Sequence, residues 1–373
     1  MFSTVLSAAL DGMNVELVHV EADVSNGLPM FHMVGYLSGE VKEAGERVKT
    51  ALINSGFSVP PKKIIINLAP ATVKKRGSSF DLPIALALLE TFSYLEEGKL
   101  ENIMTVGELG LNGEVLKVPG VLPIVMEAKR RGCTACLVPM ENVMEGQLVD
   151  NMEIIGVGKV MDVLDFLSDK ESYLAEQKQR IRDGLENESS QLCGNEIPDF
   201  ADIQGQHAAK RAAEIAVSGQ HNILMIGTPG ASKTMIAKRI STILPPMSKE
   251  ELLEISKIYS VAGLLGEQAG IRQRPFRQIH HTATKAALIG GGIVPSPGEI
   301  SLAHGGVLMM DELAEFPKTV LEVLRQPLEE REIQIIRTRG TYRFPADFLL
   351  FAAMNKRTLV PIQVNDRVRV KVA

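Results

Sequence analysis

The chain has no tryptophan, only three cysteines, no long apolar run and no excess of positive charge. Three cysteines (Cys133, Cys136 and Cys193) are too few for a disulfide framework, which predicts a reducing compartment. The Cys133-x-x-Cys136 pair lacks the second pair of ligands that a structural zinc site needs, so we interpret it as part of a buried strand. Because no apolar run could span a bilayer and no basic-then-apolar leader is present, we predict a cytoplasmic protein without membrane contact.

The net charge of −5 argues against an attraction of the whole chain to nucleic acid. Any contact with DNA must therefore come from a local basic patch. A length of 373 residues exceeds that of one typical domain, so two or three domains are expected.

Residues 1–170 mix strand and helix patterns, which predicts an α+β or α/β domain. Helical periodicity over 40–56 places Val41, Ala44, Val48 and Leu52 on one face, and Gly56 follows as a stop signal. Further patterns predict strands at 15–24, 62–70 and 133–139, and helices at 80–92 and 122–132. Residues 171–197 are charged and contain glycines, so we predict a solvated helix and a linker between two domains.

Residues 198–355 carry the pattern of a nucleotide-binding domain. A helix at 206–219 precedes an apolar strand at 222–227, a glycine-rich loop and a helix at 234–244. Two more apolar runs, 305–312 and 348–355, resemble core strands of a parallel sheet. This order predicts a parallel sheet flanked by helices.

The loop of this domain, "GTPGASKT", matches the phosphate-loop consensus G-x-x-x-x-G-K-[ST] at all fixed positions but one. In such a loop, backbone N–H groups surround the β-phosphate, a lysine reaches the β- and γ-oxygens, and a hydroxyl holds magnesium. Lys233 and Thr234 supply the last two groups. We therefore predict that ATP and Mg²⁺ bind at Gly227, Thr228, Pro229, Gly230, Ala231, Ser232, Lys233 and Thr234.

Ser232 is the departure, because it stands where the consensus has its second glycine. If this position requires a positive φ, the Cβ atom costs on the order of 1 kcal/mol. If the glycine provides clearance instead, the hydroxymethyl group would press on the phosphates or on the loop. Either cost would weaken a micromolar site without abolishing it.

Two strand ends complete the predicted site. Asp311 follows the apolar run Val307–Met310 and is placed to hold Mg²⁺, and Glu312 is placed to polarise the attacking water. Asn355 ends another apolar run, where an amide could orient that water or contact the γ-phosphate. An asparagine at a strand end is otherwise an ordinary turn former, and both interpretations stay open here.

A predicted hairpin near 330–348 carries Arg337, Arg339 and Arg343 close to its tip, which suits contacts with DNA phosphates. The alternative is a solvated hairpin with ordinary surface arginines. The adjacent His280 and His281 lack a third ligand at suitable spacing, so we interpret them as structural rather than metal-binding.

These motifs, and the stretch "RPFRQIHHTATKAALIGGGIVPSPGEISLAHGGVLMMDELAEF" that precedes the hairpin, resemble the magnesium-chelatase-type AAA+ ATPases. More narrowly, the chain resembles the competence-related YifB/ComM proteins, as "GLPMFHMVG", "VKEAGERVKTALINSGF" and "VGELGLNGEVLKVPGVLP" show. The resemblance implies a cytoplasmic ATPase that associates with itself into a ring, which is a hexamer in the family. It also implies a DNA substrate, with branch migration during recombination in natural transformation as the role.

The resemblance also implies that the first domain has the Lon-protease-like fold, related to ribosomal S5 domain 2. Lon cleaves with a serine–lysine dyad, and alignment places Asp81 and Leu122 at those two positions, although Ser78 and Ser79 lie nearby. A serine without a desolvated general base is not an activated nucleophile, so we predict no proteolysis. We expect instead a domain that binds nucleic acid or a partner, or that organises the ring.

The family pattern is lost after Asn355, and residues 356–373 form an atypical basic tail that contains Arg357, Arg367 and Arg369. The resemblance implies a helical lid with an arginine finger beyond this point, so we expect a truncation or frame change with weak ATP binding and near-background hydrolysis. Two alternatives to a DNA-acting ATPase remain from the sequence. One is the motor subunit of a metal chelatase, and the other is a non-catalytic product that acts only as a binding module.

Overall fold

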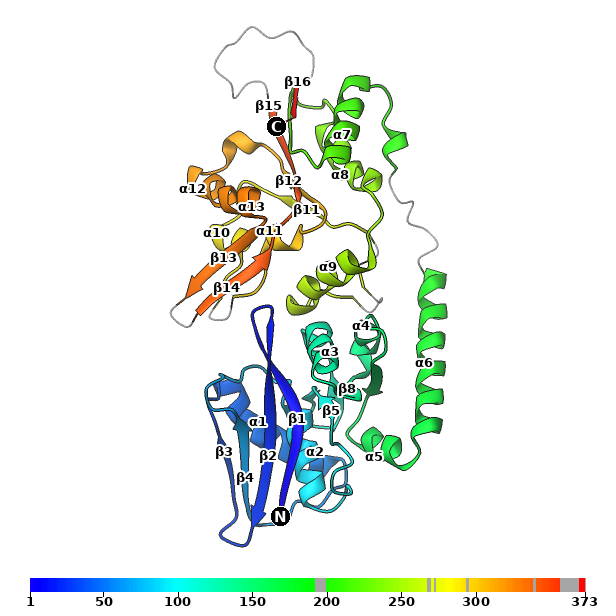
Figure 1. The fold of residues 1–373 in the computed structure, drawn as a ribbon, viewed down its shortest axis with the longest axis vertical. Helices are drawn as coiled ribbons and strands as arrows, with labels where there is room; N and C mark the ends of the chain where they lie inside the picture. Colours follow the sequence, from blue (N-terminus) through cyan, green and yellow to red (C-terminus); the bar gives the residue numbers. More distant parts are fainter. Residues whose placement is uncertain are drawn as a thin grey trace. The chain divides into compact units, whose positions relative to one another are not determined.

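The computed structural model describes residues 1–191, 199–266, 270–271, 273–292, 295–337, 340–355 and 369–372 (Figure 1). The chain forms two compact units, one of residues 1–194 with 263–270 and one of residues 195–262 with 271–373. The sequence predicts domain boundaries at 170 and 198. The charged segment after 170 is largely a helix that packs on the first unit, which moves the structural division to residue 194. In the described part of the chain, no helix combines the length and apolarity needed to cross a bilayer.

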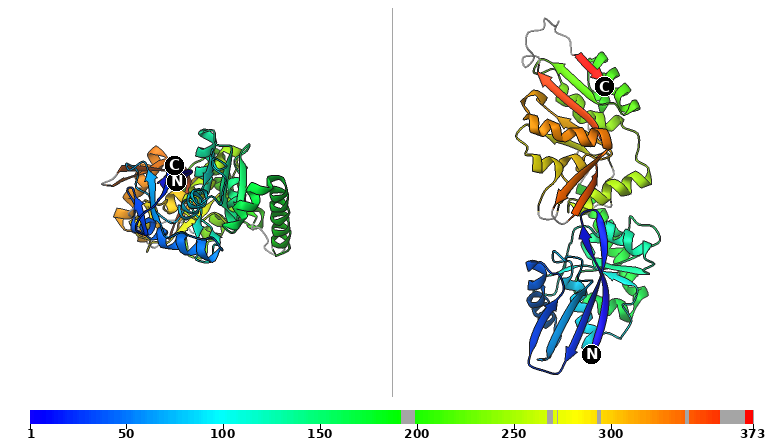
Figure 2. Two further views of the ribbon diagram at one scale, coloured as in Figure 1. Left: turned by 90° about the horizontal axis from the view of Figure 1, so that it is seen from below. Right: turned by 60° about the vertical axis from the view of Figure 1, so that its left-hand side comes forward.

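The first unit contains a seven-stranded mixed sheet in the order β3-β4-β2-β1-β5-β8-β9, with β3 and β9 as its outer strands (Figures 1 and 2). Its strands are β1 (Phe2–Asp11), β2 (Asn14–Ser25), β3 (Met30–Val34), β4 (Lys63–Ala69), β5 (Ile103–Thr105), β8 (Ala135–Pro139) and β9 (Glu153–Val157), with the small pair β6 (Glu108–Leu109) and β7 (Val115–Leu116) beside it. Its helices are α1 (Gly39–Asn54), α2 (Asp81–Thr91), α3 (Val121–Arg130), α4 (Val143–Gly146), α5 (Met161–Ser168) and α6 (Lys170–Gln191).

The core of this unit lies between the sheet and two helices. Helix α2 is apolar all round and buried along almost its whole length, as expected for a helix covered on every side. Helix α1 buries the predicted face, including Val41, Ala44 and Val48, and Gly56 follows it with a φ of +88°. Strand β4 alternates, with Ile64, Ile66 and Leu68 in the core. The strand and helix patterns predicted for this unit are confirmed.

The second unit is built on a five-stranded sheet in the order β11-β12-β15-β10-β16, with a separate β13–β14 hairpin. The strands β10 to β12 and β15 are parallel, and β16 runs antiparallel to β10. The strands are β10 (Ile223–Gly227), β11 (Phe276–Ile279), β12 (Val307–Met310), β13 (Glu332–Arg337), β14 (Gly340–Pro345), β15 (Leu349–Asn355) and β16 (Arg369–Val372). The helices are α7 (His207–Gly219), α8 (Lys233–Ile240), α9 (Lys249–Val261), α10 (Lys285–Ile289), α11 (Glu299–Leu302), α12 (Lys318–Leu321) and α13 (Arg325–Glu330).

The parallel register decides which residues meet at one edge of the second sheet. Gly227 at the end of β10 lies opposite Asn355 at the end of β15, and Met310 at the end of β12 lies opposite Ala352. Because parallel strands end on the same side, the residues that follow them gather at the carboxyl edge. Ligands of open α/β sheets bind at this edge. The fold thereby brings the predicted site residues together from three separate strands.

Candidate nucleotide site

The phosphate-loop candidate connects the end of β10 to the start of α8, as predicted. Gly230 has a φ of +81° and Ser232 a φ of +58°, so both lie in the left-handed region. The structure thus favours the first of the two sequence-based explanations for Ser232, a backbone conformation that suits glycine. The Cβ atom of Ser232 then costs on the order of 1 kcal/mol in the loop.

Lys233 opens α8 with its side chain turned back into the loop. The residue is 8% exposed, and its ammonium donates to Gly227 O (3.3 Å), Thr228 O (2.9 Å) and Asn355 Oδ1 (3.1 Å). Burial lowers the pKa of Lys233, and the nearby Asp311 carboxylate opposes that shift. The three acceptors are uncharged oxygens, so a buried cation is held without a directly bonded anion. This arrangement suits an anionic ligand such as a phosphate.

Thr234 and Asp311 meet beside this lysine. The Thr234 hydroxyl donates to Asp311 Oδ2 at 3.1 Å, and Asp311 Oδ1 accepts the backbone N–H of Glu312 at 3.0 Å. A hydroxyl and a carboxylate at the end of a strand are hard oxygen donors of the kind that Mg²⁺ prefers. The residues present therefore fit a magnesium ion next to a bound phosphate chain.

Glu312 follows Asp311 in a left-handed conformation, with a φ of +53° and a side chain that is 46% exposed. Its Oε2 lies 3.6 Å from Nδ1 of His281, which follows the neighbouring strand β11. That Nδ1 is buried and has no hydrogen-bond partner among the described residues. The sequence interpretation of His281 as a structural residue gave it no place beside Glu312, because strand β11, which positions it, was not among the predicted strands.

The paired histidines form no metal centre in the described residues, which contain no cluster of three or more His, Cys, Asp or Glu side chains able to hold a metal. The His280 and His281 rings lie 4.0 Å apart, and His280 Nδ1 contacts the Thr282 hydroxyl at 3.0 Å.

Family models of the magnesium chelatase subunit ChlI match residues 199–368 and residues 20–142. The YifB proteins of Salmonella typhimurium and Escherichia coli are 43% and 42% identical to the chain, over 92% and 95% of its length. Competence protein ComM of Haemophilus influenzae is 42% identical over 94% of the chain. The chain belongs to the YifB/ComM family of magnesium-chelatase-like AAA+ proteins. It spans 66%, 68% and 68% of the length of these three relatives.

This YifB/ComM-type chain also shares sequence with Lon proteases. Lon protease 2 of Bacillus subtilis is 31% identical over 126 residues, which is 33% of the chain and 22% of that protein. The aligned dyad positions hold Asp81, which is paired with Arg47, and Leu122, which is fully buried in α3. The nearby Ser78 hydroxyl donates to the Glu108 carboxylate.

The structure also contains a buried lysine that the sequence analysis missed. Lys75 is fully buried, which lowers its pKa, and its ammonium donates to Pro70 O. Because Ser78 is bonded to a carboxylate and Lys75 to a carbonyl, the two do not form an activated pair. The absence of proteolysis stays a prediction.

Two of the predicted DNA-contacting arginines of this YifB/ComM-type chain, Arg337 and Arg343, lie on the β13–β14 hairpin. Arg337 and Arg343 are exposed, and Arg343 Nη1 is 3.8 Å from Glu332 Oε1. Ile336 beside them is 70% exposed. Arg339 lies outside the described residues, as do Arg357 and Arg367 of the tail.

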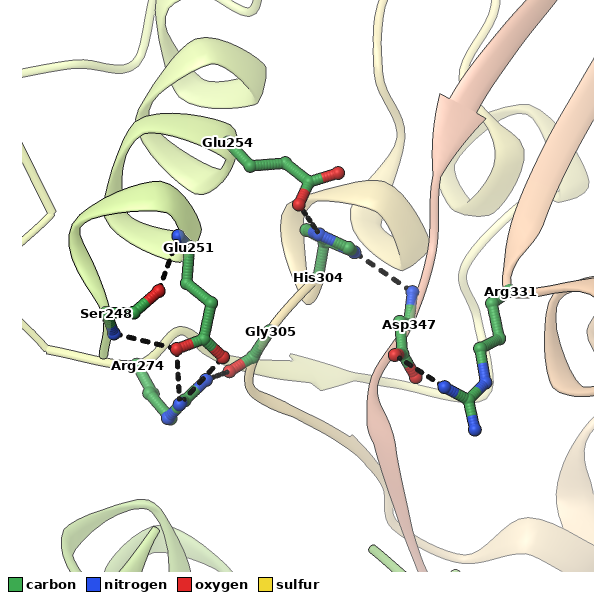
Figure 3. A network of polar contacts seen from close by, with 8 residues as sticks. All are labelled: Ser248, Glu251, Glu254, Arg274, His304, Gly305, Arg331 and Asp347. Carbon is green, nitrogen blue, oxygen red and sulfur yellow. Dashed lines mark hydrogen bonds and ion pairs between the residues drawn. The ribbon is translucent and has the colours of Figure 1, made fainter. Parts of the chain in front are cut away.

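A second polar cluster lies at the opposite edge of the sheet, where β12 and β15 begin, around a cavity of about 400 Å³ (Figure 3). Arg274 donates to Gly305 O at 2.8 Å and to Glu251 at 2.9 Å. His304 Nδ1 accepts the N–H of Asp347 at 3.0 Å, so the ring carries its proton on Nε2, which faces the Glu254 carboxylate at 3.5 Å. Arg274 thus forms an ion pair with Glu251 of α9 and bonds the segment just before β12, and we assign the cluster a structural role in joining α9 to the sheet.

Ser232→Gly is expected to strengthen ATP binding about fivefold, because glycine relieves a cost of about 1 kcal/mol at a positive φ. The measurement is a titration with a fluorescent ATP analogue. Ala231→Gly is the matched control, since Ala231 has no positive φ and gains no relief from the same change. Equal gains in the two variants would show that loop flexibility, rather than the conformation of Ser232, limits binding.

Proposed function

We propose that this chain is an ATP-binding AAA+ protein that acts on DNA, in the branch migration of recombining strands during natural transformation. The observation that carries the nucleotide part is the meeting of Lys233, Thr234, Asp311 and Asn355 at the carboxyl edge of one parallel sheet. Hydrogen bonds join these residues in two pairs across 122 and 77 positions of sequence. A chance motif match would not bring about that convergence.

Each residue then has a role that its surroundings allow. The backbone N–H groups of the first turn of α8 and the Lys233 ammonium bind the phosphate oxygens. Thr234 and Asp311 would hold Mg²⁺, which neutralises charge on the phosphates when it is bound. Glu312 accepts a proton from the attacking water, and the Asn355 amide orients that water. His281 stands beside Glu312, where its ring can fix the position of the carboxylate.

The DNA part of the proposal rests on the β13–β14 hairpin and on the family. Arg337 and Arg343 are exposed on a chain whose net charge is negative, so they offer a local basic patch. The name of the Haemophilus influenzae relative links that protein to competence. In a ring, the patch of each subunit would add to those of its neighbours.

Charge reversal at the hairpin tests this part. The Arg337→Glu/Arg343→Glu double variant is expected to weaken binding of a fluorescent four-way DNA junction at least tenfold, because phosphate contacts dominate such affinities. Arg325→Glu/Arg211→Glu is the control, since both arginines are surface residues elsewhere in the same unit. ATP-analogue affinity should be unchanged in both. Equal junction binding by the two double variants would remove the hairpin from the proposal.

The motor subunit of a metal chelatase would use the same ATPase core. The match of the ChlI family models to this chain is therefore compatible with a DNA-acting ATPase and with a chelatase motor. The Lon-like first unit favours the DNA-linked branch, because chelatase motors of the family usually begin directly with the AAA+ core. ATP hydrolysis measured with branched DNA and, separately, with chelatase partner subunits distinguishes the two. Stimulation by the chelatase partners alone would favour the second function.

A further inference from the structure

The two outer strands of the seven-stranded sheet differ in how their backbones are bonded. The outer side of β9 is closed by α6. Gln177 accepts the N–H of Gly156 at 2.8 Å and donates to Ile154 O at 3.0 Å, and the Tyr173 hydroxyl donates to Gly156 O at 2.7 Å. These side chains replace a neighbouring strand, which is one way for a protein to protect a sheet edge.

Among the described residues, nothing covers the outer side of strand β3 at the other edge in this way. Strand β3 runs parallel to β4, and the N–H of Met30 donates to Lys62 O. In a parallel ladder, every second residue of a strand forms its backbone hydrogen bonds with the same neighbouring strand. Because Met30 bonds β4, the backbone N–H and C=O groups of Phe31 and Met33 point away from β4. Within the described part of the chain, no hydrogen bond takes up these groups. An open edge of this kind is a template for another strand.

The side chains around this edge are apolar and exposed. The exposed fractions are 44% for Met30 and 41% for Val34 within β3, and 87% for Leu28 and 43% for Tyr36 beside it. Residues 30–34 contain no lysine, proline or carboxylate of the kind that normally discourages edge pairing. Pro29 cannot donate a backbone hydrogen bond, so it limits the pairing segment on its N-terminal side.

The pattern is also self-complementary about its central residue, His32. In an antiparallel pair of two β3 strands centred there, Phe31 of one copy faces Met33 of the other, and their outward N–H and C=O groups can bond each other. The same register places Met30 opposite Val34 of the second copy. The two exposed apolar side chains within the strand thereby gain apolar partners.

We propose that β3 is a docking edge for a second copy of this chain, which pairs antiparallel with it about a two-fold axis at His32. An unrelated peptide would satisfy the backbone as well, but nothing in β3 would select its sequence, whereas the register about His32 matches the exposed Met30 of one copy with the exposed Val34 of the other. A five-residue edge buries little area, so the dimer is weak and concentration-dependent. The proposal does not depend on nucleotide or DNA binding.

Disulfide trapping on the full chain tests the register. In the proposed pairing the two His32 residues face each other at a Cα separation of roughly 4.5 Å, so His32→Cys should cross-link under mild oxidation. Met30→Cys is the matched control, because its symmetry mate lies about 13 Å away, too far for a disulfide. The unmodified chain measures the background from Cys133, Cys136 and Cys193. Equal cross-linking of the two variants would overturn the proposal.

Sedimentation velocity without nucleotide tests the interface itself. Met30→Lys/Val34→Lys places like charges opposite each other and should weaken self-association about tenfold or more, whereas Met30→Lys/Val34→Glu places opposite charges there and should restore it to within about threefold. Both double variants change the same exposed positions, and circular dichroism verifies their folding. A monomeric unmodified chain at the highest soluble concentration would overturn the proposal, as would equal association of the two double variants.

Discussion

Lys233→Ala should weaken ATP binding about 100-fold, which corresponds to about 2.7 kcal/mol. The ammonium of Lys233 is buried in the loop and bonded to three uncharged oxygens, so it is the cation placed to meet a phosphate. Alanine removes that charge and leaves the backbone N–H groups of the loop as the main phosphate ligands. The measurement is a titration with a fluorescent ATP analogue in the presence of Mg²⁺.

Lys238→Ala provides the control for this prediction. Lys238 belongs to the same helix α8 but is exposed, so its loss should change affinity less than twofold. Circular dichroism would verify that both variants are folded. Equal affinities of Lys233→Ala and the unmodified chain would remove the phosphate-loop assignment, and with it the nucleotide part of the proposed function.

Arg47→Ala should destabilise the first unit by about 3 kcal/mol, because it leaves a buried carboxylate without its cation. Asp81 is fully buried at the start of α2, and Arg47 donates to both of its oxygens, at 2.9 and 3.0 Å. The backbone N–H of Leu109 adds a longer bond at 3.3 Å. Urea unfolding followed by circular dichroism measures the loss, and hydrogen exchange of the α2 amides assigns it to this unit.

The loss of stability caused by Arg47→Ala should depend on pH. Burial raises the pKa of the Asp81 carboxyl, and the Arg47 guanidinium and the Leu109 amide oppose the rise. The pKa of Asp81 is therefore higher in the folded protein than in the unfolded chain. As the pH rises above the unfolded pKa of Asp81, its ionisation lowers the free energy of unfolding. Removal of Arg47 raises this pKa further, so the deficit of the variant should grow with increasing pH and shrink towards acid pH. There Asp81 is protonated and needs no cation.

Lys99→Ala is the control for both statements. Lys99 forms an exposed ion pair with Glu96 in the same unit, and such pairs contribute about 0–1 kcal/mol. Its removal should change stability little at any pH. A deficit of Arg47→Ala that stays constant from pH 8 to pH 5 would show that lost packing, rather than the uncompensated charge, is the cause.

The sequence predicted most of the elements that position the nucleotide site, because their signals are local. Strands β10, β12 and β15 follow from apolar runs, and the phosphate loop follows from glycines beside Lys233 and Thr234. Helix α1 follows from the spacing of its apolar residues. The domain boundary was harder to predict, because α6 is polar along most of its length. Its polar residues Lys170, Tyr173 and Gln177 bond it to the edge strand β9, which no local sequence signal indicates.

The sequence by itself determined the fold class, the family and the chemical types of the site residues, because each of these follows from motifs and patterns within short continuous segments. Only the tertiary structure decided which residues meet. Strand register brings Asn355 to Lys233, and strand order places His281 beside Glu312. The left-handed conformation of Ser232 was also decided by the structure, because the residue type alone does not specify the backbone conformation. The open edge at β3 was likewise decided by sheet order, because a strand's position in its sheet depends on distant segments of the chain.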